Sequence, residues 1–169
     1  MATTTISAIR TALVARVEAL TPTTAVRQDR GQAVFRQRGG GRARPPGIWA
    51  LEELQQPNAA DDRTFLFRFG GGMRDTGATS QVERRTMLDA EMALLYYWPA
   101  DDQADDLDLR IQQDALDIDK DLTDWLETGP LAGLLPTTAV TTDQPPTPHA
   151  SGAALVKRIG LVLDFWRAG

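Results

Sequence analysis

The sequence predicts a single-domain α+β fold: a mixed, mostly antiparallel sheet of about four to five strands, two main helices packed on it, and long flexible loops. Two segments carry apolar residues at helical spacing, and three others alternate as strands do. Stretches rich in glycine and proline separate them. With 169 residues, 42% of them hydrophobic, the chain fits one domain and can bury one core.

Residues 6–20 and 106–127 are predicted to form the two helices. Thr4 and Thr5 are candidate N-caps for the first helix, because a threonine hydroxyl can accept a hydrogen bond from a free backbone N–H of the first turn. The second helix has the stronger pattern, with aspartates opposite an apolar stripe. That stripe consists of Leu107, Ile111, Ala115, Ile118, Leu122 and Trp125 or Leu126.

Residues 63–69 and 82–98 are predicted to form a long antiparallel hairpin, because apolar residues occupy alternate positions in both. Residues 33–37 and 139–142 are candidate short strands. The last strand, 155–166, is apolar on both faces for part of its length, which is typical of a central strand. Mobile loops are expected at about 37–47, 70–81 and 136–152.

Charge is distributed unevenly along the chain, although the net charge is only −5. Residues 27–44 contain six arginines and one aspartate, whereas residues 101–127 contain ten aspartates, one glutamate and two basic residues. Both segments can be solvated surface. Alternatively, opposite patches on identical subunits meet head to tail, and such a contact generates a ring when the rotation closes.

No catalytic constellation is recognisable, so no enzyme activity, catalytic residue or cofactor is predicted. The chain has no cysteine, and its one histidine, His149, lies among prolines and threonines without a nucleophile motif. Neither of the two glycine runs, Gly39-Gly40-Gly41 and Gly70-Gly71-Gly72, continues into a phosphate-binding motif. Four aspartates could bind magnesium, but a solvated helix start explains them better, so no metal site is predicted. They are Asp101, Asp102, Asp105 and Asp106.

The order of these elements resembles the tail terminator family of long-tailed bacteriophages. Four segments carry the resemblance: ATTTISAIRTALVARVEAL, VERRTMLDAEMALLYYWPA, DLDLRIQQDALDIDKDLTDWLE and ALVKRIGLVLDFWRAG. The resemblance implies a virion protein that forms a ring, typically a hexamer, on the last ring of the tail tube. It also implies that this ring ends tube polymerisation and offers a surface to the head–tail connector protein.

Contact residues are nominated from the local sequence, because the family offers no catalytic residue to carry over. Arg36, Arg38, Arg42 and Arg44 form a basic contact, and Met73, Arg74 and Asp75 form the hairpin tip. An acidic face of the second helix supplies the opposite charge or lines a lumen through which DNA passes without specific binding. This face consists of Asp114, Asp117, Asp121 and Asp124.

Three other functions remain open: a neck protein, a metal-dependent enzyme, and a binding domain with no connection to phages. A head-completion or connector protein of the phage neck would also use small domains in rings. A magnesium-dependent enzyme acting on nucleic acid would use the four aspartates that precede the second helix. The first residues are polar, and no apolar stretch approaches the length that a bilayer requires, so no membrane association is expected.

Overall fold

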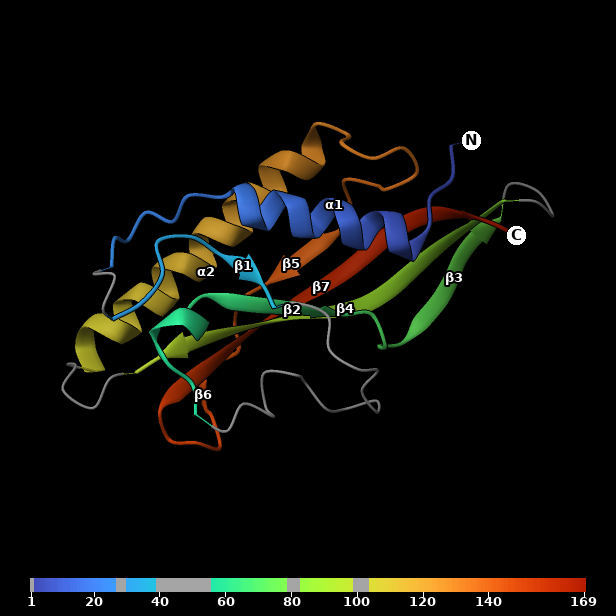
Figure 1. Ribbon diagram of the computed structural model, residues 1–169. Helices are drawn as coiled ribbons and strands as arrows, with labels where there is room; N and C mark the ends of the chain where they lie inside the picture. The colour runs from blue at the N-terminus through green and yellow to red at the C-terminus, as the bar shows by residue number, and fades with distance from the viewer. Residues whose placement is uncertain (1, 27–29, 39–55, 79–82, 99–103) are drawn as a thin grey trace.

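The computed structural model describes residues 2–26, 30–38, 56–78, 83–98 and 104–169. Its two helices, α1 (Ile6–Ala19) and α2 (Ala104–Glu127), lie on one face of a sheet (Figure 1). The Thr5 hydroxyl caps α1 by accepting a hydrogen bond from the Ala8 N–H at 3.1 Å. Both predicted helices are therefore confirmed, with ends that differ from the prediction by at most two residues.

The sheet has seven strands in the order β1-β2-β4-β7-β5, with β3 beside β4 and β6 beside β7. β1 and β2 are parallel, and the other pairings are antiparallel. The predicted α+β class is confirmed, although the strands outnumber the four to five expected. They are β1 (Arg36–Gln37), β2 (Thr64–Arg68), β3 (Met73–Ala78), β4 (Glu83–Tyr97), β5 (Ala139–Thr141), β6 (Thr147–Pro148) and β7 (Ala154–Ala168).

β7 is a central strand, as its two apolar faces predict. It pairs with the whole of β4, from Glu83 opposite Ala168 to Tyr97 opposite Ala154, and its other edge carries β5 and β6. Leu163 lies in the core beneath the helices, whereas Val156 belongs to a smaller apolar cluster with Leu95. Burial on both sides explains why the polar and apolar residues do not alternate cleanly here.

The prediction of a flexible loop at 70–81 is wrong for residues 73–78, because these residues form β3. β2 and β3 pair in succession with the same edge of β4, and the glycine run joins them. The Asp89 N–H donates to the Gly72 carbonyl at 2.9 Å, and a Cβ on Gly71 would lie 2.2 Å from the Asp89 carbonyl oxygen. The glycines therefore permit a close backbone approach within the sheet.

The other short segments are partly as expected. β5 confirms the strand proposed at 139–142, but only Arg36 and Gln37 of the strand proposed at 33–37 pair with a neighbour. Residues 136–152 include β5 and β6, and the Lys157 Nζ donates to the carbonyls of Thr142, at 2.7 Å, and Gln144. Residues 39–47 of the first predicted loop lie outside the described residues.

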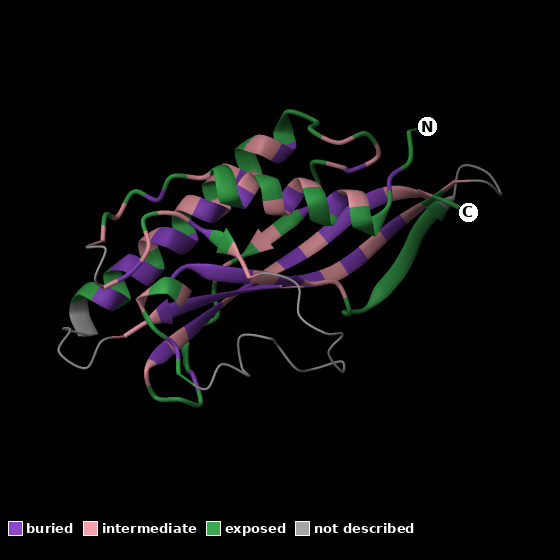
Figure 2. Ribbon diagram, viewed as in Figure 1, coloured by how far each residue is buried: buried purple, intermediate pink, exposed green. Residues whose placement is uncertain are grey.

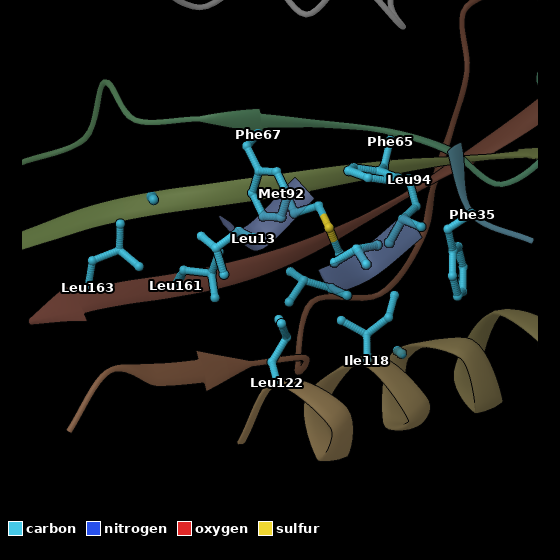
Figure 3. Close-up of a cluster of buried hydrophobic side chains, with 14 of the residues drawn as sticks. Leu13, Phe35, Phe65, Phe67, Met92, Leu94, Ile118, Leu122, Leu161 and Leu163 are labelled. Carbon is cyan, nitrogen blue, oxygen red and sulfur yellow. The ribbon is translucent and has the colours of Figure 1, made fainter. Parts of the chain in front are cut away.

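The main core lies between the helices and the sheet (Figure 3). Leu13 of α1 and Leu122 of α2 point toward Phe65, Met92 and Leu161 on the sheet, and all five side chains are buried. This packing fixes both helices to the long β4–β7 pair. The exposed surfaces include the outer sides of α1 and α2 and the end of the sheet that carries β3 (Figure 2).

Candidate interaction surfaces

One candidate surface is the end of the sheet beside the start of α1, which we call the β-arm. It consists of β3 with residues 83–88 of β4 and residues 163–168 of β7, and it extends past the start of α1 (Figure 1). Residues 73–77 of β3 are all exposed (Figure 2). Within the described part of the chain, β3 pairs with β4 alone, so its outer edge carries unpaired backbone groups.

The three residues predicted at a hairpin tip lie in β3 instead. Met73 is 57% exposed and stands opposite Leu88, on the helix side of the sheet. Arg74 points to the other side, where its Nη1 lies 3.5 Å from Asp89 Oδ1. The structure therefore separates Met73 from Arg74 across the sheet, because consecutive side chains of a strand point to opposite faces.

Asp75 organises the helix side of the β-arm. It accepts hydrogen bonds from the Thr86 hydroxyl at 2.9 Å, from Arg84 at 3.2 Å and from Arg167 at 3.2 Å. The hydrogen bond from Thr86 lowers the pKa of the Asp75 carboxyl, and Arg84 and Arg167 act in the same direction. Two arginines therefore surround one aspartate, which leaves this cluster with one positive charge in excess.

The predicted basic contact is only partly described. Arg36 is exposed, whereas Arg38 donates to Asp61 at 3.0 Å and is half-buried. Arg42 and Arg44 lie outside the described residues. The described pair therefore presents one arginine to solvent and uses the other to hold β1 near the short helix η1 (Ala59–Asp61).

The predicted acidic face of α2 is corrected by the structure, because it turns inward at its start. Asp114 is inaccessible to solvent. Asp117 accepts from the Thr23 N–H at 2.8 Å, and Asp121 forms a bidentate ion pair with Arg16 of α1 at 2.6 and 2.8 Å. Of the four aspartates, Asp124 is the most exposed, and it pairs with Lys120. Asp114 therefore cannot line a lumen.

The fully buried Asp114 belongs to an ionic network that the sequence analysis did not anticipate. Arg63 donates to it from Nε and Nη2, both at 2.8 Å, and the Tyr96 hydroxyl donates to it at 3.0 Å. Burial raises the pKa of the Asp114 carboxyl, although hydrogen bonds from Arg63 and Tyr96 act in the opposite direction. Burial also raises the pKa of Tyr96 well above its ordinary value, which keeps the hydroxyl protonated as a donor.

A second buried ion pair lies beside the first. Arg110 of α2 donates to both oxygens of Asp62, at 2.6 and 3.0 Å. Asp62 also accepts from the backbone N–H groups of Tyr97 and Gln32, at 2.9 and 3.1 Å. The two pairs connect α2 to the start of β2 and to the end of β4, so their role is structural. In the sequence, the charged Asp62-Arg63 dipeptide directly before an apolar strand is the feature that could have indicated these buried ion pairs.

The second candidate surface is the outer side of α2. Leu109 and Leu116 are 71% and 57% exposed, and they lie two helical turns apart on the side opposite the buried stripe. Asp106 and Asp108 are exposed near Leu109. A pocket of about 480 Å³ opens beside Leu109, and its walls include Val26, Leu107, Gln113, Arg30 and Arg110.

The described residues include some of the side chains that could take part in bond chemistry. They contain no group of three or more histidine or acidic side chains that could hold a metal ion, and Asp101, Asp102 and the Asp105 side chain lie outside them. Asp106 is exposed on α2. His149 is buried in the turn before β7, where its Nδ1 accepts from the Ser151 N–H at 3.1 Å and lies 2.7 Å from the Ser151 hydroxyl.

In the part of the chain that the structure describes, no helix is both long enough and apolar enough to cross a membrane. Comparisons of the chain with protein-family models, curated proteins and solved structures found no match.

Proposed function

We propose that this protein is a structural component of a phage virion that forms a ring at the head-proximal end of a long tail tube. The ring ends polymerisation of the tube protein and provides the surface for joining to the head–tail connector. Its partners are copies of itself, six in the typical case, together with the tail tube protein and the connector protein. DNA passes through the ring without specific binding, and the protein carries out no bond chemistry.

One observation supports this function most directly. The β-arm together with the start of α1, and the outer side of α2, are separate surfaces, and each exposes two large apolar side chains. Two different surfaces on identical subunits suit a head-to-tail contact, whereas a two-fold contact uses one surface twice. Repetition of a head-to-tail contact gives a ring when the rotation closes.

The net negative charge of the chain supports the proposed passage of DNA. Each copy carries a formal net charge of −5, so a ring of copies is negative as a whole. A negatively charged ring repels the phosphate backbone, so DNA would move past it without adhering.

The test has two stages. Light scattering across a concentration series measures the mass of the purified protein, and electron microscopy then shows where it binds on isolated tail tubes and on portal complexes. A ring that caps tube ends and stops the addition of tube protein supports the proposal. Binding to portal complexes alone would assign the protein to the neck instead, and a strict monomer that ignores both would refute an assembly role.

The enzyme alternative is tested on the same preparation. Incubation with nucleic acid and magnesium should leave the nucleic acid intact. Cleavage that is lost on chelation would favour the metal-dependent enzyme, with Asp101, Asp102, Asp105 and Asp106 as the first residues to replace.

A further inference from the structure

Four large hydrophobic side chains are substantially exposed in the described part of the chain, and they fall into two pairs. Ile6 and Met73 are 37% and 57% exposed, and Leu109 and Leu116 are 71% and 57% exposed. Single exposed apolar residues are common on protein surfaces, but pairs of them on two separate surfaces suggest contact sites.

The first pair lies at the end of the molecule where the β-arm adjoins the start of α1. Met73 stands opposite Leu88, which stands opposite Leu163 of β7, and the Thr4 N–H donates to the Trp166 carbonyl at 2.8 Å. These contacts place the start of α1, with Ile6, at the same end of the molecule as Met73 (Figure 1). Arg84 and Arg167 lie on the same side of this sheet. We call Ile6, Met73, Arg84 and Arg167 the arm patch.

The second pair lies on α2. Leu109 and Leu116 form a stripe on its outer side, and Asp106 and Asp108 are exposed beside the first of them. Arg110, which follows Leu109, is buried and paired with Asp62, and the exposed Lys120, one turn after Leu116, is paired with Asp124. We call Leu109, Leu116, Asp106 and Asp108 the helix patch. It is therefore apolar at its centre and negative at the end that carries Asp106 and Asp108.

We infer that the arm patch of one copy docks on the helix patch of the next copy in the ring. The inference rests on the proposed function, because it names the subunit contact of that ring. The two patches match in chemistry, since each has two apolar side chains and their charges are opposite. Arg84 and Arg167 share one aspartate, Asp75, so the arm patch keeps a positive charge for Asp106 and Asp108 of its neighbour.

The shapes of the patches also agree with this contact. The pocket of about 480 Å³ beside Leu109 is a recess on the helix side of the contact. Met73 projects from an exposed edge strand, and a methionine side chain adapts readily to an irregular recess. A contact between two arm patches would instead bring the arginines of both copies together, and a contact between two helix patches would do the same for the aspartates.

Charge substitutions in each patch test the direction of the contact. One variant carries Ile6→Glu and Met73→Glu, and the other carries Leu109→Glu and Leu116→Glu. All four positions are exposed, so both variants should fold, with circular dichroism as the check. Each variant alone should self-associate at least about tenfold more weakly than the wild type. Ala150→Glu, at an exposed turn between β6 and β7, is the matched control and should assemble normally.

Mixing the two variants distinguishes a head-to-tail contact from a two-fold one. The arm-patch variant keeps its helix patch, and the helix-patch variant keeps its arm patch, so the mixture should form one-to-one dimers that cannot grow. Either variant dimerising by itself as strongly as the wild type, or a mixture that contains only monomers, would overturn the inference.

Cross-linking gives a second test that also works on tail tubes. The chain has no cysteine, so Met73→Cys and Leu116→Cys each introduce one thiol. A short bis-maleimide should join a Met73→Cys copy to a Leu116→Cys copy, and joining of Met73→Cys copies to one another would overturn the contact. Protein that caps tubes without the mixed cross-link keeps the proposed function but not this contact, whereas protein that neither caps tubes nor self-associates refutes both.

Discussion

Asp114 of α2 accepts two hydrogen bonds of 2.8 Å from the Arg63 guanidinium, and both side chains are inaccessible to solvent. Arg63 also adopts a positive φ of 55°, which is uncommon for a residue other than glycine. The remaining donors of Arg63 reach the Thr24 and Gln32 carbonyls, at 2.8 and 2.9 Å. This pair therefore joins α2, the start of β2 and the segment after α1 at one buried point.

Replacing Asp114 by alanine should destabilise the protein strongly. The substitution leaves the Arg63 charge buried without a counter-charge, which typically costs about 3–5 kcal/mol. Urea denaturation followed by circular dichroism measures the free energy of unfolding. Asp124→Ala is the control on the same helix, and the exposed Asp124–Lys120 pair should contribute little to stability, because solvent screens it. Equal effects of the two substitutions would contradict this account of Asp114.

A double-mutant cycle on Arg63 and Asp114 should show that their effects are coupled. Arg63→Met with Asp114→Leu removes both charges, so the combined loss should be smaller than the sum of the single losses by about 1–3 kcal/mol. Simple additivity would mean that the two side chains act independently. The residues of the Asp62–Arg110 pair are unaltered in all the variants, whereas replacing Asp114 also removes the acceptor of the Tyr96 hydroxyl.

Most of the fold follows from hydrophobic periodicity. The stripes that include Leu13 and Ile118 predict both helices, and the two apolar faces of residues 155–166 predict a central strand. β3 escapes this method because its residues 73–77 are exposed and its polar side chains are satisfied across the sheet. Pairing with β4 makes residues 73–78 a strand, and pairing partners are not visible in the local pattern.

The contact residues were harder to predict, because charge alone does not show which way a side chain points. Asp114 and Asp117 have the spacing of one helix face, but that face turns toward Arg63 and the segment around Thr23. A buried arginine inverts the usual expectation that aspartates lie on the wet side of a helix. The exposed Leu109 and Leu116 are equally hard to recognise, since leucine in a helix normally indicates the core.

Gly71→Ala should disturb the join between β2 and β3. Its Cβ would lie 2.2 Å from the Asp89 carbonyl oxygen, which is backbone and cannot move aside without shifting β4. We expect a loss of about 1–3 kcal/mol, as for other overpacked sites. Gly70→Ala is the matched control, because no atom lies within 4 Å of its added Cβ. Similar stability of the two variants would show that the close approach at Gly71 is not required.

Acid should destabilise the protein partly through Asp164. Arg85 donates to both of its oxygens, at 2.7 and 3.0 Å, and these hydrogen bonds lower the pKa of the Asp164 carboxyl below its ordinary value of 3.8. A lowered pKa in the folded state means that the unfolded chain takes up this proton first as the pH falls. The stabilisation is therefore complete above the ordinary aspartate pKa and is lost as the pH falls through the lowered one.

Asp164→Asn removes this titration while it keeps the size of the side chain. At neutral pH the variant should be less stable by about 1–3 kcal/mol, because the charge-assisted hydrogen bonds from Arg85 are weakened. The ordinary carboxyl pKa lies between about pH 5 and pH 2. Over this range, the free energy of unfolding should fall less steeply for the variant than for the wild type. Parallel curves over this range would show that Asp164 titrates alike in the folded and unfolded states, and the ion pair with Arg85 would then contribute nothing to acid sensitivity.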